Sequence, residues 1–226
     1  MNISKRPLLA RMGLVAQTTR WRPTLAAWSV AVLLLALAGV GCVRFAFPFL
    51  AVTDRVETRV LVVEGWLPDL MPIDPVLSEF RDGRYDLLVV TGGPTPRREL
   101  LGDFGTYAEL TRTILVRKGL DPEVVVAVPS IGVAKDRTYA TAVALRRWIE
   151  EKRPEVRAVN LLTLGAHARR SRLMFQEALG DRVKVGVIST GDLRYSGGRW
   201  WKSSSGVREV LGESLAYCYA RLVFRP

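Results

Sequence analysis

The sequence has few of the residues that build disulfide frameworks and metal sites. It contains one histidine and two cysteines in 226 residues, and the cysteines, Cys42 and Cys218, lie far apart. Two lone cysteines without clustered histidine or cysteine partners form neither a disulfide framework nor a zinc site. The sequence therefore predicts no metal site, although Glu64, Asp136 and His167 could converge in space.

The common phosphate-binding fingerprints are also missing. Neither GxxxxGK[ST] nor GxGxxG occurs, and there is no internal repeat or low-complexity tract. The sequence thus leaves the cofactor unknown. A hydrophobic content of 49% is enough for a core, and 226 residues fit one domain with an appendage. The net charge of +11 favours anionic partners, which include lipids, phosphates and nucleic acids.

Acidic residues are absent from the first 24 positions, which carry five lysines and arginines. The uncharged run Leu25–Val43 follows, and 19 residues are enough to cross a bilayer core of about 30 Å. A basic leader before such a run predicts a single-pass anchor with the N-terminus cytoplasmic and the C-terminal domain outside. That placement argues against a nucleic-acid partner. The expected organisation is a leader (1–24), a transmembrane helix (25–43), a linker (44–57) and a domain (58–226).

Two other interpretations of the apolar run are open. A buried core helix would normally carry a polar face, which this run lacks. Cleavage is the second alternative, because "AGVGC", ending at Cys42, partly matches a bacterial lipoprotein box. Gly39 stands where that motif has leucine, however, and no Ala-x-Ala site follows. The pattern favours an uncleaved anchor.

Beyond the anchor, apolar β-branched runs alternate with segments of helical period. The runs predict strands at 59–65, 86–93, 123–129, 158–165 and 183–189. Predicted helices cover 75–81, 104–118, 138–152, 168–179 and 206–224. Near-continuous valine and leucine indicates strands buried on both faces. We expect an α/β fold: a Rossmann-like three-layer domain with a mostly parallel central sheet, plus one N-terminal transmembrane helix.

Ligands of open parallel sheets bind beyond the carboxyl ends of the strands. Polar or glycine residues stand at or just after the ends of four predicted strands. The candidate catalytic residues are His167 and Glu64, and the candidate anion-binding residues are Gly92, Gly93, Arg137, Thr138, Thr163 and Arg170.

The only histidine opens the helix after the fourth strand. His167 and Arg170, three residues apart, share one face of its first turn. Cations at a helix N-terminus are unfavourable unless an anion or acidic partner offsets them. We expect His167 and Arg170 to face a ligand, with a solvated basic surface as the alternative. For Arg169 and Arg172 the solvated surface is the favoured interpretation.

Two other candidates each have a functional and a structural interpretation. Glu64 is either a general base with a raised pKa or an ion-pair partner for Arg170 or Arg137. The Gly92–Gly93 turn either presents backbone N–H groups to an anion or makes a tight strand–helix connection.

The C-terminal region adds two structural expectations. Val207, Leu211, Leu215, Cys218 and Leu222 recur at spacings of three and four. We expect this stripe to pack the last helix onto the domain, with Cys218 in the core. In the preceding "RWWK" we expect Trp200 or Trp201 to be exposed near the site, as a lid or at the membrane interface. The alternative is that both pack beneath the last helix.

Residues 58–224 contain "VVEGW", "VVTGGP", a threonine that opens the helix after the third strand, and strand–"TxxxHxxRS"–helix. In these features the chain resembles the YdcF-like (SanA/ElyC) family. Gly92 and Gly93 match the family's glycine turn, and Thr138 matches its "TxEN" helix start. His167 and Arg170 match its "HxxRA". The chain has alanine and threonine where many members have the Glu and Asn of "TxEN", and Glu64 is the candidate replacement for that carboxylate.

The resemblance implies a Rossmann-like domain, often membrane-anchored, that acts in bacterial envelope biogenesis at the inner (plasma) membrane. Members are tied to peptidoglycan or lipid-carrier metabolism and to barrier function, and one cytoplasmic-type member resembles a binder of S-adenosylmethionine. Two function classes remain, and whether the protein is an enzyme stays open. The first acts on or binds a phosphate-bearing envelope precursor, such as a lipid carrier or peptidoglycan intermediate. The second is a non-catalytic module that recognises an envelope glycan, a nucleotide-like ligand or a partner protein.

Overall fold

The computed structural model describes residues 23–65, 72–95, 105–130 and 135–225. The chain divides into two compact units, Met1–Gly41 and Cys42–Pro226. The predicted basic leader lies almost entirely outside the described residues.

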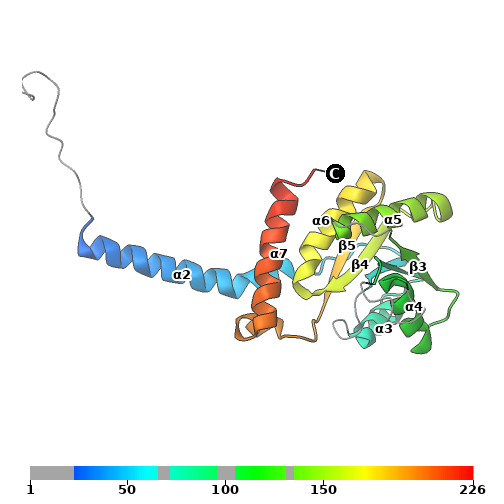
Figure 1. The fold of residues 1–226 in the computed structure, drawn as a ribbon, viewed down its shortest axis with the longest axis horizontal. Helices are drawn as coiled ribbons and strands as arrows, with labels where there is room; N and C mark the ends of the chain where they lie inside the picture. Colours follow the sequence, from blue (N-terminus) through cyan, green and yellow to red (C-terminus); the bar gives the residue numbers. More distant parts are fainter. Residues whose placement is uncertain (1–22, 66–71, 96–104, 131–134, 226) are drawn as a thin grey trace, which may run out of the picture. The chain divides into compact units, whose positions relative to one another are not determined.

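The second unit contains a five-stranded, all-parallel sheet in the order β3-β2-β1-β4-β5 (Figure 1). The strands are β1 (Val60–Glu64), β2 (Leu87–Gly92), β3 (Val125–Pro129), β4 (Ala158–Leu164) and β5 (Lys184–Thr190). The chain steps outward from β1 to β3, then returns to the other side of β1 for β4 and β5. The predicted strands are confirmed at nearly the same bounds, because nearly continuous burial along β1, β2 and β4 required continuous apolar sequence.

Helices cover both faces of the sheet. On one face lie α3 (Ile73–Asp82) and α4 (Tyr107–Arg117), and on the other α5 (Arg137–Lys152) and α6 (Ala168–Leu179). Successive β1 side chains alternate between the layers: Val63 joins the core under α3 and α4, and Val62 joins the core under α5 and α6. Burying each such side chain stabilises the fold by about 1.5–3 kcal/mol. The three-layer Rossmann-like prediction is confirmed.

One apolar helix, α2 (Leu25–Leu50), precedes the sheet and is long and apolar enough to cross a membrane. By length and composition it fits a membrane anchor or a signal sequence. It continues past the predicted end at Val43, and its last turns belong to the second unit. There Leu50 is fully buried, and the Val43 carbonyl accepts a hydrogen bond from Trp200 Nε1 at 3.0 Å. The segment 44–57 therefore begins as helix packed into the domain instead of as a linker.

Two arginines of α6 hold the chain that leaves α2. The Arg169 guanidinium lies 4.0 Å from the centre of the Phe49 ring, and its Nε donates to the Phe49 carbonyl. Arg172 forms an ion pair with Asp54 at 2.7 Å and donates to the Val185 carbonyl at 3.1 Å. The prediction of a solvated basic surface was therefore wrong for both, because the last turn of α2, the segment after it and β5 supply carbonyl and carboxylate acceptors.

The last helix, α7 (Ser204–Leu222), packs on the domain with a face that differs from the predicted one. Gly206, Val210, Glu213 and Ala220 are buried, whereas Leu211, Leu215, Cys218 and Leu222 are exposed. Gly206 allows this face to pack closely against the domain. A Cβ at Gly206 would lie 2.4 Å from the Trp200 carbonyl oxygen, so only glycine lets the helix approach this closely.

The tryptophan pair lies in the short helix η4 (Gly197–Lys202) and packs against α2 and α7. Trp200 is buried, and Trp201 is half-buried with its ring edge-on to Trp200 at 6.1 Å between centres. Neither lines the pocket described below. The prediction that one tryptophan is exposed near the site was wrong, because the end of α2 covers this segment.

Candidate functional site

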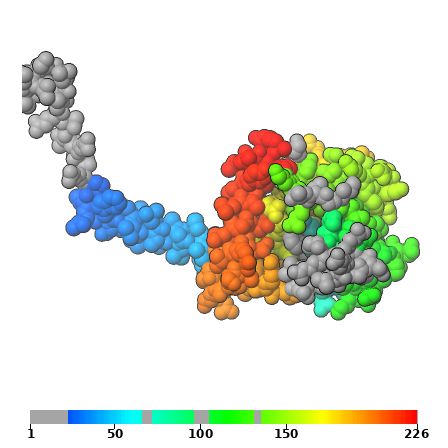
Figure 2. Space-filling model, viewed as in Figure 1, coloured from blue at the N-terminus to red at the C-terminus, as the bar shows by residue number. Residues whose placement is uncertain are grey.

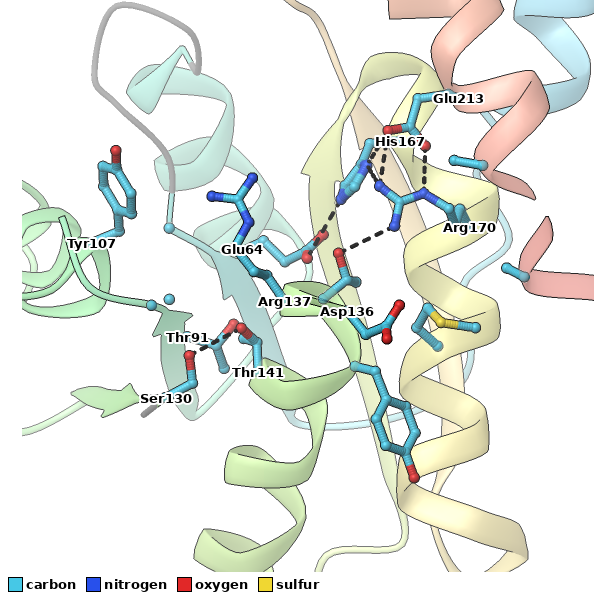
Figure 3. A pocket seen from close by; sticks show the side chains of 18 of the residues that line it. Glu64, Thr91, Tyr107, Ser130, Asp136, Arg137, Thr141, His167, Arg170 and Glu213 are labelled. Carbon is cyan, nitrogen blue, oxygen red and sulfur yellow. Dashed lines mark hydrogen bonds and ion pairs between the residues drawn. The ribbon is translucent and has the colours of Figure 1, made fainter. Parts of the chain in front are cut away.

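A pocket of about 650 Å³ lies at the carboxyl ends of the strands, where the strand order reverses between β1 and β4 (Figure 3). Ligands of this fold class bind at such a switch point. Of the eight sequence-predicted residues, the pocket lining includes Glu64, Gly92, Gly93, Arg137, Thr138, His167 and Arg170. Thr163 is fully buried near the end of β4 and does not line the pocket.

His167 stands in the short turn η2 (Gly165–His167) between β4 and α6, where it is 3% exposed. Its Nδ1 lies 2.8 Å from Glu213 Oε1, and its Nε2 lies 3.8 Å from Glu64 Oε1. The only imidazole of the chain thus sits between two carboxylates, one from β1 and one from α7 (Figure 3).

Arg170, one turn further along α6, forms an ion pair with the carboxylate of Glu213 on α7. Its Nε and one terminal nitrogen donate to the two oxygens of Glu213 at 2.8 and 2.9 Å, and its other terminal nitrogen donates to Thr138 Oγ1 at 3.3 Å. This forked geometry is the strongest form of arginine–carboxylate pairing. The sequence predicted that Arg170 pairs with a ligand anion or with Glu64. In the described structure Arg170 pairs with Glu213 instead.

Glu64 is 6% exposed at the end of β1. Ser171 Oγ donates to its Oε2 at 2.6 Å, and the Thr163 hydroxyl beside it also favours the ionised carboxylate. Burial alone would raise the pKa of Glu64. The charge of His167 and these hydroxyl groups outweigh it and lower the pKa. The interpretation of Glu64 as a base with a raised pKa was therefore wrong, because a buried cation lies beside it.

The two glutamates have the opposite effect on His167. Burial alone would lower its pKa, but the charge of Glu64 and the hydrogen bond to Glu213 raise it to about 9. The pKa of Glu213 falls to about 2: burial opposes this, but the hydrogen bonds to Arg170 and His167 prevail. At neutral pH the four groups are two cations and two anions, a buried network without net charge.

Arg137 is the other arginine of the pocket lining. It is exposed in the first turn of α5 and extends into the space bordered by Glu64 and His167 (Figure 3). Arg137 takes part in none of the ion pairs between described residues. The N-terminus of α5 faces the same pocket, and Asp136 precedes it in a left-handed conformation without a side-chain capping bond. A helix N-terminus and an arginine together favour an anion here.

The two glycines of the turn have different surroundings. A Cβ at Gly92 would lie 2.8 Å from the backbone nitrogen of Ala108, so close packing against α4 requires glycine there. At Gly93 the nearest atom to such a Cβ is Ser130 Oγ at 3.4 Å, which is ordinary contact. The tight-connection interpretation holds for Gly92, and Gly93 remains the position with room beside the pocket.

Part of the pocket lining is apolar, and we call this part the apolar wall. Tyr139 from α5 and Phe224 after α7 meet edge-on at 5.2 Å between ring centres. Met174, Ala216 and Ala220 line the same pocket from α6 and α7. The pocket lining therefore combines charged residues with this apolar wall, which suits a ligand with an anionic group and an apolar part.

Sequence reasoning missed Glu213. It lies 46 residues beyond His167 on another helix, and no short motif joins the two. The available signal was a lone acid inside the apolar run "VLGESLA", where a buried carboxylate needs a cationic partner. Among the described residues, no group of three histidine, cysteine or acidic side chains is arranged to hold a metal ion. The convergence considered for Glu64, Asp136 and His167 therefore does not form a metal site there.

Comparisons with known proteins identify no family for this chain. No protein-family profile, curated protein or solved structure matches the chain.

Proposed function

We propose that this protein is a membrane-anchored, extracytoplasmic YdcF/SanA-like protein of cell-envelope biogenesis that binds or acts on a phosphate-bearing envelope precursor. A lipid carrier or a peptidoglycan intermediate is the ligand class. The family resemblance rests on the glycine turn and on the HxxR element, Gly92–Gly93 and His167–Arg170, both of which line the pocket.

The observation that carries the proposal is the contrast between the two pocket arginines. Arg170 is held by Glu213, so its charge is neutralised within the protein. Arg137 is exposed in the same pocket, outside the ion pairs of the described residues, and stands at the N-terminus of α5. An arginine placed this way is suited to a phosphate, which accepts charge-assisted hydrogen bonds from the guanidinium and from backbone N–H groups.

The apolar wall narrows the ligand class. A free sugar phosphate leaves Tyr139, Met174 and Phe224 facing water, whereas a lipid-linked phosphate places hydrocarbon against them. Burying apolar surface contributes about 25 cal/mol per Å². A ligand that combines a phosphate with an apolar chain therefore uses both the charged residues and the apolar wall.

In the catalytic form of the proposal, His167 is the acid. With a pKa of about 9 it carries a proton at neutral pH, so it donates to a departing oxygen instead of accepting from water. Glu64 and Glu213 keep the imidazole charged and fix its orientation. As a water attacks the phosphorus, the bond to the leaving oxygen breaks, that oxygen takes the His167 proton, and both protons of the water stay on the released phosphate, which leaves His167 neutral.

We expect Arg137→Ala to weaken binding of a polyprenyl phosphate by the full-length protein in detergent about tenfold or more. A hydrogen bond to a charged group contributes about 1.5–3 kcal/mol. Because Arg137 is exposed, the free energy of unfolding should change by less than about 0.5 kcal/mol. Calorimetric titration measures the affinity, and chemical denaturation measures the stability.

The matched control is Arg147→Ala, which removes an exposed arginine from the same helix outside the pocket. It should leave the affinity unchanged. Equal affinities for wild type and Arg137→Ala would contradict the anion site.

The second candidate is a non-catalytic binding module for an envelope glycan, a nucleotide-like ligand or a partner protein. It is favoured by the complete internal pairing of Arg170 and Glu213, which is as suited to holding α7 in place as to chemistry. Release of inorganic phosphate from bound polyprenyl pyrophosphate separates the two. Release that His167→Gln abolishes, with binding retained, supports an enzyme, and binding without release supports the module.

Topology gives a further prediction. If α2 is a single span with the basic leader in the cytoplasm, a reporter fused after Pro226 is active only if it works outside the inner membrane. Alkaline phosphatase fused there should be active, and a fluorescent protein that folds only in the cytoplasm should be dark. The reverse pattern contradicts the proposed localisation.

A further inference from the structure

A stripe of apolar residues on α7 faces outward. Leu211, Leu215 and Leu222 are 52%, 74% and 71% exposed, and Cys218 between them is also exposed. Their spacings of four, three and four residues place them on one side of the helix. Figure 2 shows α7, coloured orange to red, as a ridge on the surface of the second unit. Within the described residues, this stripe is an apolar surface without a packing partner.

The charges around the stripe have a single sign. The exposed charged residues of η4, α7 and the chain end that follows are Arg199, Lys202, Arg208, Arg221 and Arg225. Both acids of α7 have cationic partners within the protein: Glu213 is buried against His167 and Arg170, and the half-buried Glu209 forms an ion pair with Arg194 at 2.8 Å. An apolar stripe flanked only by cations is the pattern of helices that lie in the interface of an anionic bilayer.

The stripe is also next to the end of the candidate membrane helix. Within the second unit, the Phe49 ring of α2 meets the Tyr217 ring of α7 at 5.6 Å, and Leu50 packs with Val210. Phe45, one turn before Phe49, is 73% exposed. Apolar surface therefore continues from the last turns of α2 onto the side of α7.

We propose that α7 is an interfacial helix whose outward stripe, Leu211, Leu215, Cys218 and Leu222, binds the surface of an anionic lipid bilayer. The exposed arginines contact the lipid headgroups, and the inward side keeps Glu213 bonded to His167 and Arg170. The same helix supplies Ala216 and Ala220 to the pocket wall, so the pocket lies one helix away from the lipid surface. This proposal does not depend on which ligand the pocket binds.

The native cysteine makes the test direct. Full-length Cys42→Ala protein carries a single thiol, Cys218, at the centre of the stripe, which takes a nitroxide spin label. The protein is placed in nanodiscs containing phosphatidylglycerol, at one chain per disc. Collision of the label with oxygen, which concentrates in lipid, is compared with collision with a water-soluble nickel chelate. The reference label is at Lys118→Cys in a Cys42→Ala, Cys218→Ser background, an exposed position after α4.

We expect the label at Cys218 to collide with oxygen and to be protected from nickel, and the label at position 118 to behave in the opposite way. Nickel access at Cys218 equal to that at position 118 overturns the proposal. A second copy of the chain as the true occupant gives nickel access in singly loaded discs, with spin–spin broadening when two chains share a disc. That result also overturns it.

A substitution on the stripe provides the second arm. Leu215→Glu changes a position that is 74% exposed, so it should leave thermal unfolding unchanged. It should lower the ratio of lipid-bound to lipid-free α7 about tenfold or more. Nickel access at Cys218 then rises toward that of the reference position. Lys118→Glu, which adds the same acid away from the stripe, should leave Cys218 protected. Protection that survives Leu215→Glu contradicts lipid contact.

Discussion

Glu213→Gln should be among the most destabilising single changes in the domain. The substitution keeps the shape of the side chain and removes the charge that pairs with both His167 and Arg170. Removing one partner of a buried ionic network costs about 3–5 kcal/mol, because the remaining charges stay buried and uncompensated. Chemical denaturation of the full-length protein at pH 7 measures the loss of the free energy of unfolding.

Glu209→Gln is the matched control, because it removes an acid from the same helix. Glu209 pairs with the more accessible Arg194, and such pairs contribute about 1 kcal/mol or less. Glu213→Gln should also lower the pKa of His167 below about 9, since the hydrogen bond to Glu213 is one cause of its elevation. Two variants of equal stability would show that Glu213 is not part of a buried network.

The stability of the protein should fall in mildly alkaline solution. The pKa of His167 is raised from its ordinary value of 6.5 to about 9 in the folded state. A raised folded pKa contributes stability that is fully present below pH 6.5 and is lost as the pH rises through about 9. A shift of this size corresponds to about 3 kcal/mol.

The carboxylates act in the opposite pH range. Their lowered pKa values contribute stability that is present above about pH 4.5, and it is lost as the pH falls through the folded values. The free energy of unfolding measured from pH 6.5 to 9.5 should decline for wild type and stay nearly level for His167→Gln. A wild-type profile as flat as that of the variant would mean that His167 is not charged between the two glutamates.

The sheet was predictable because a strand that is buried along its length consists of consecutive apolar residues. Runs such as "LLVV" before Thr91 are stable only as strands buried on both faces. The segments between them, in which apolar residues recur with a helical period, predict the helices that cover the sheet. The strand-end rule then brought Glu64, Arg137 and His167 into one region, because carboxyl ends of parallel strands share an edge.

The contacts of the C-terminal helix α7 were less predictable. An apolar stripe on α7 does not say whether it faces protein or another apolar medium, so the stripe containing Leu215 was assigned to the wrong environment. Which face packs was decided by Gly206, which allows close approach, and by Glu213, which finds its partners only in the folded structure. The predicted direction of the Glu64 pKa shift was wrong for the same reason, because that direction depends on the distance between Glu64 and His167.

The proposed function requires that a phosphate-bearing ligand binds in the pocket beside a charged His167. Because the chain has a single histidine, its imidazole nitrogen signals are unambiguous in ¹⁵N-histidine-labelled, tag-free protein. At pH 7, we expect signals of a protonated ring that shift saturably as polyprenyl phosphate is added to wild type, and that shift far less in Arg137→Ala. A neutral ring at pH 7, or saturating binding that leaves the His167 signals unmoved, would contradict it.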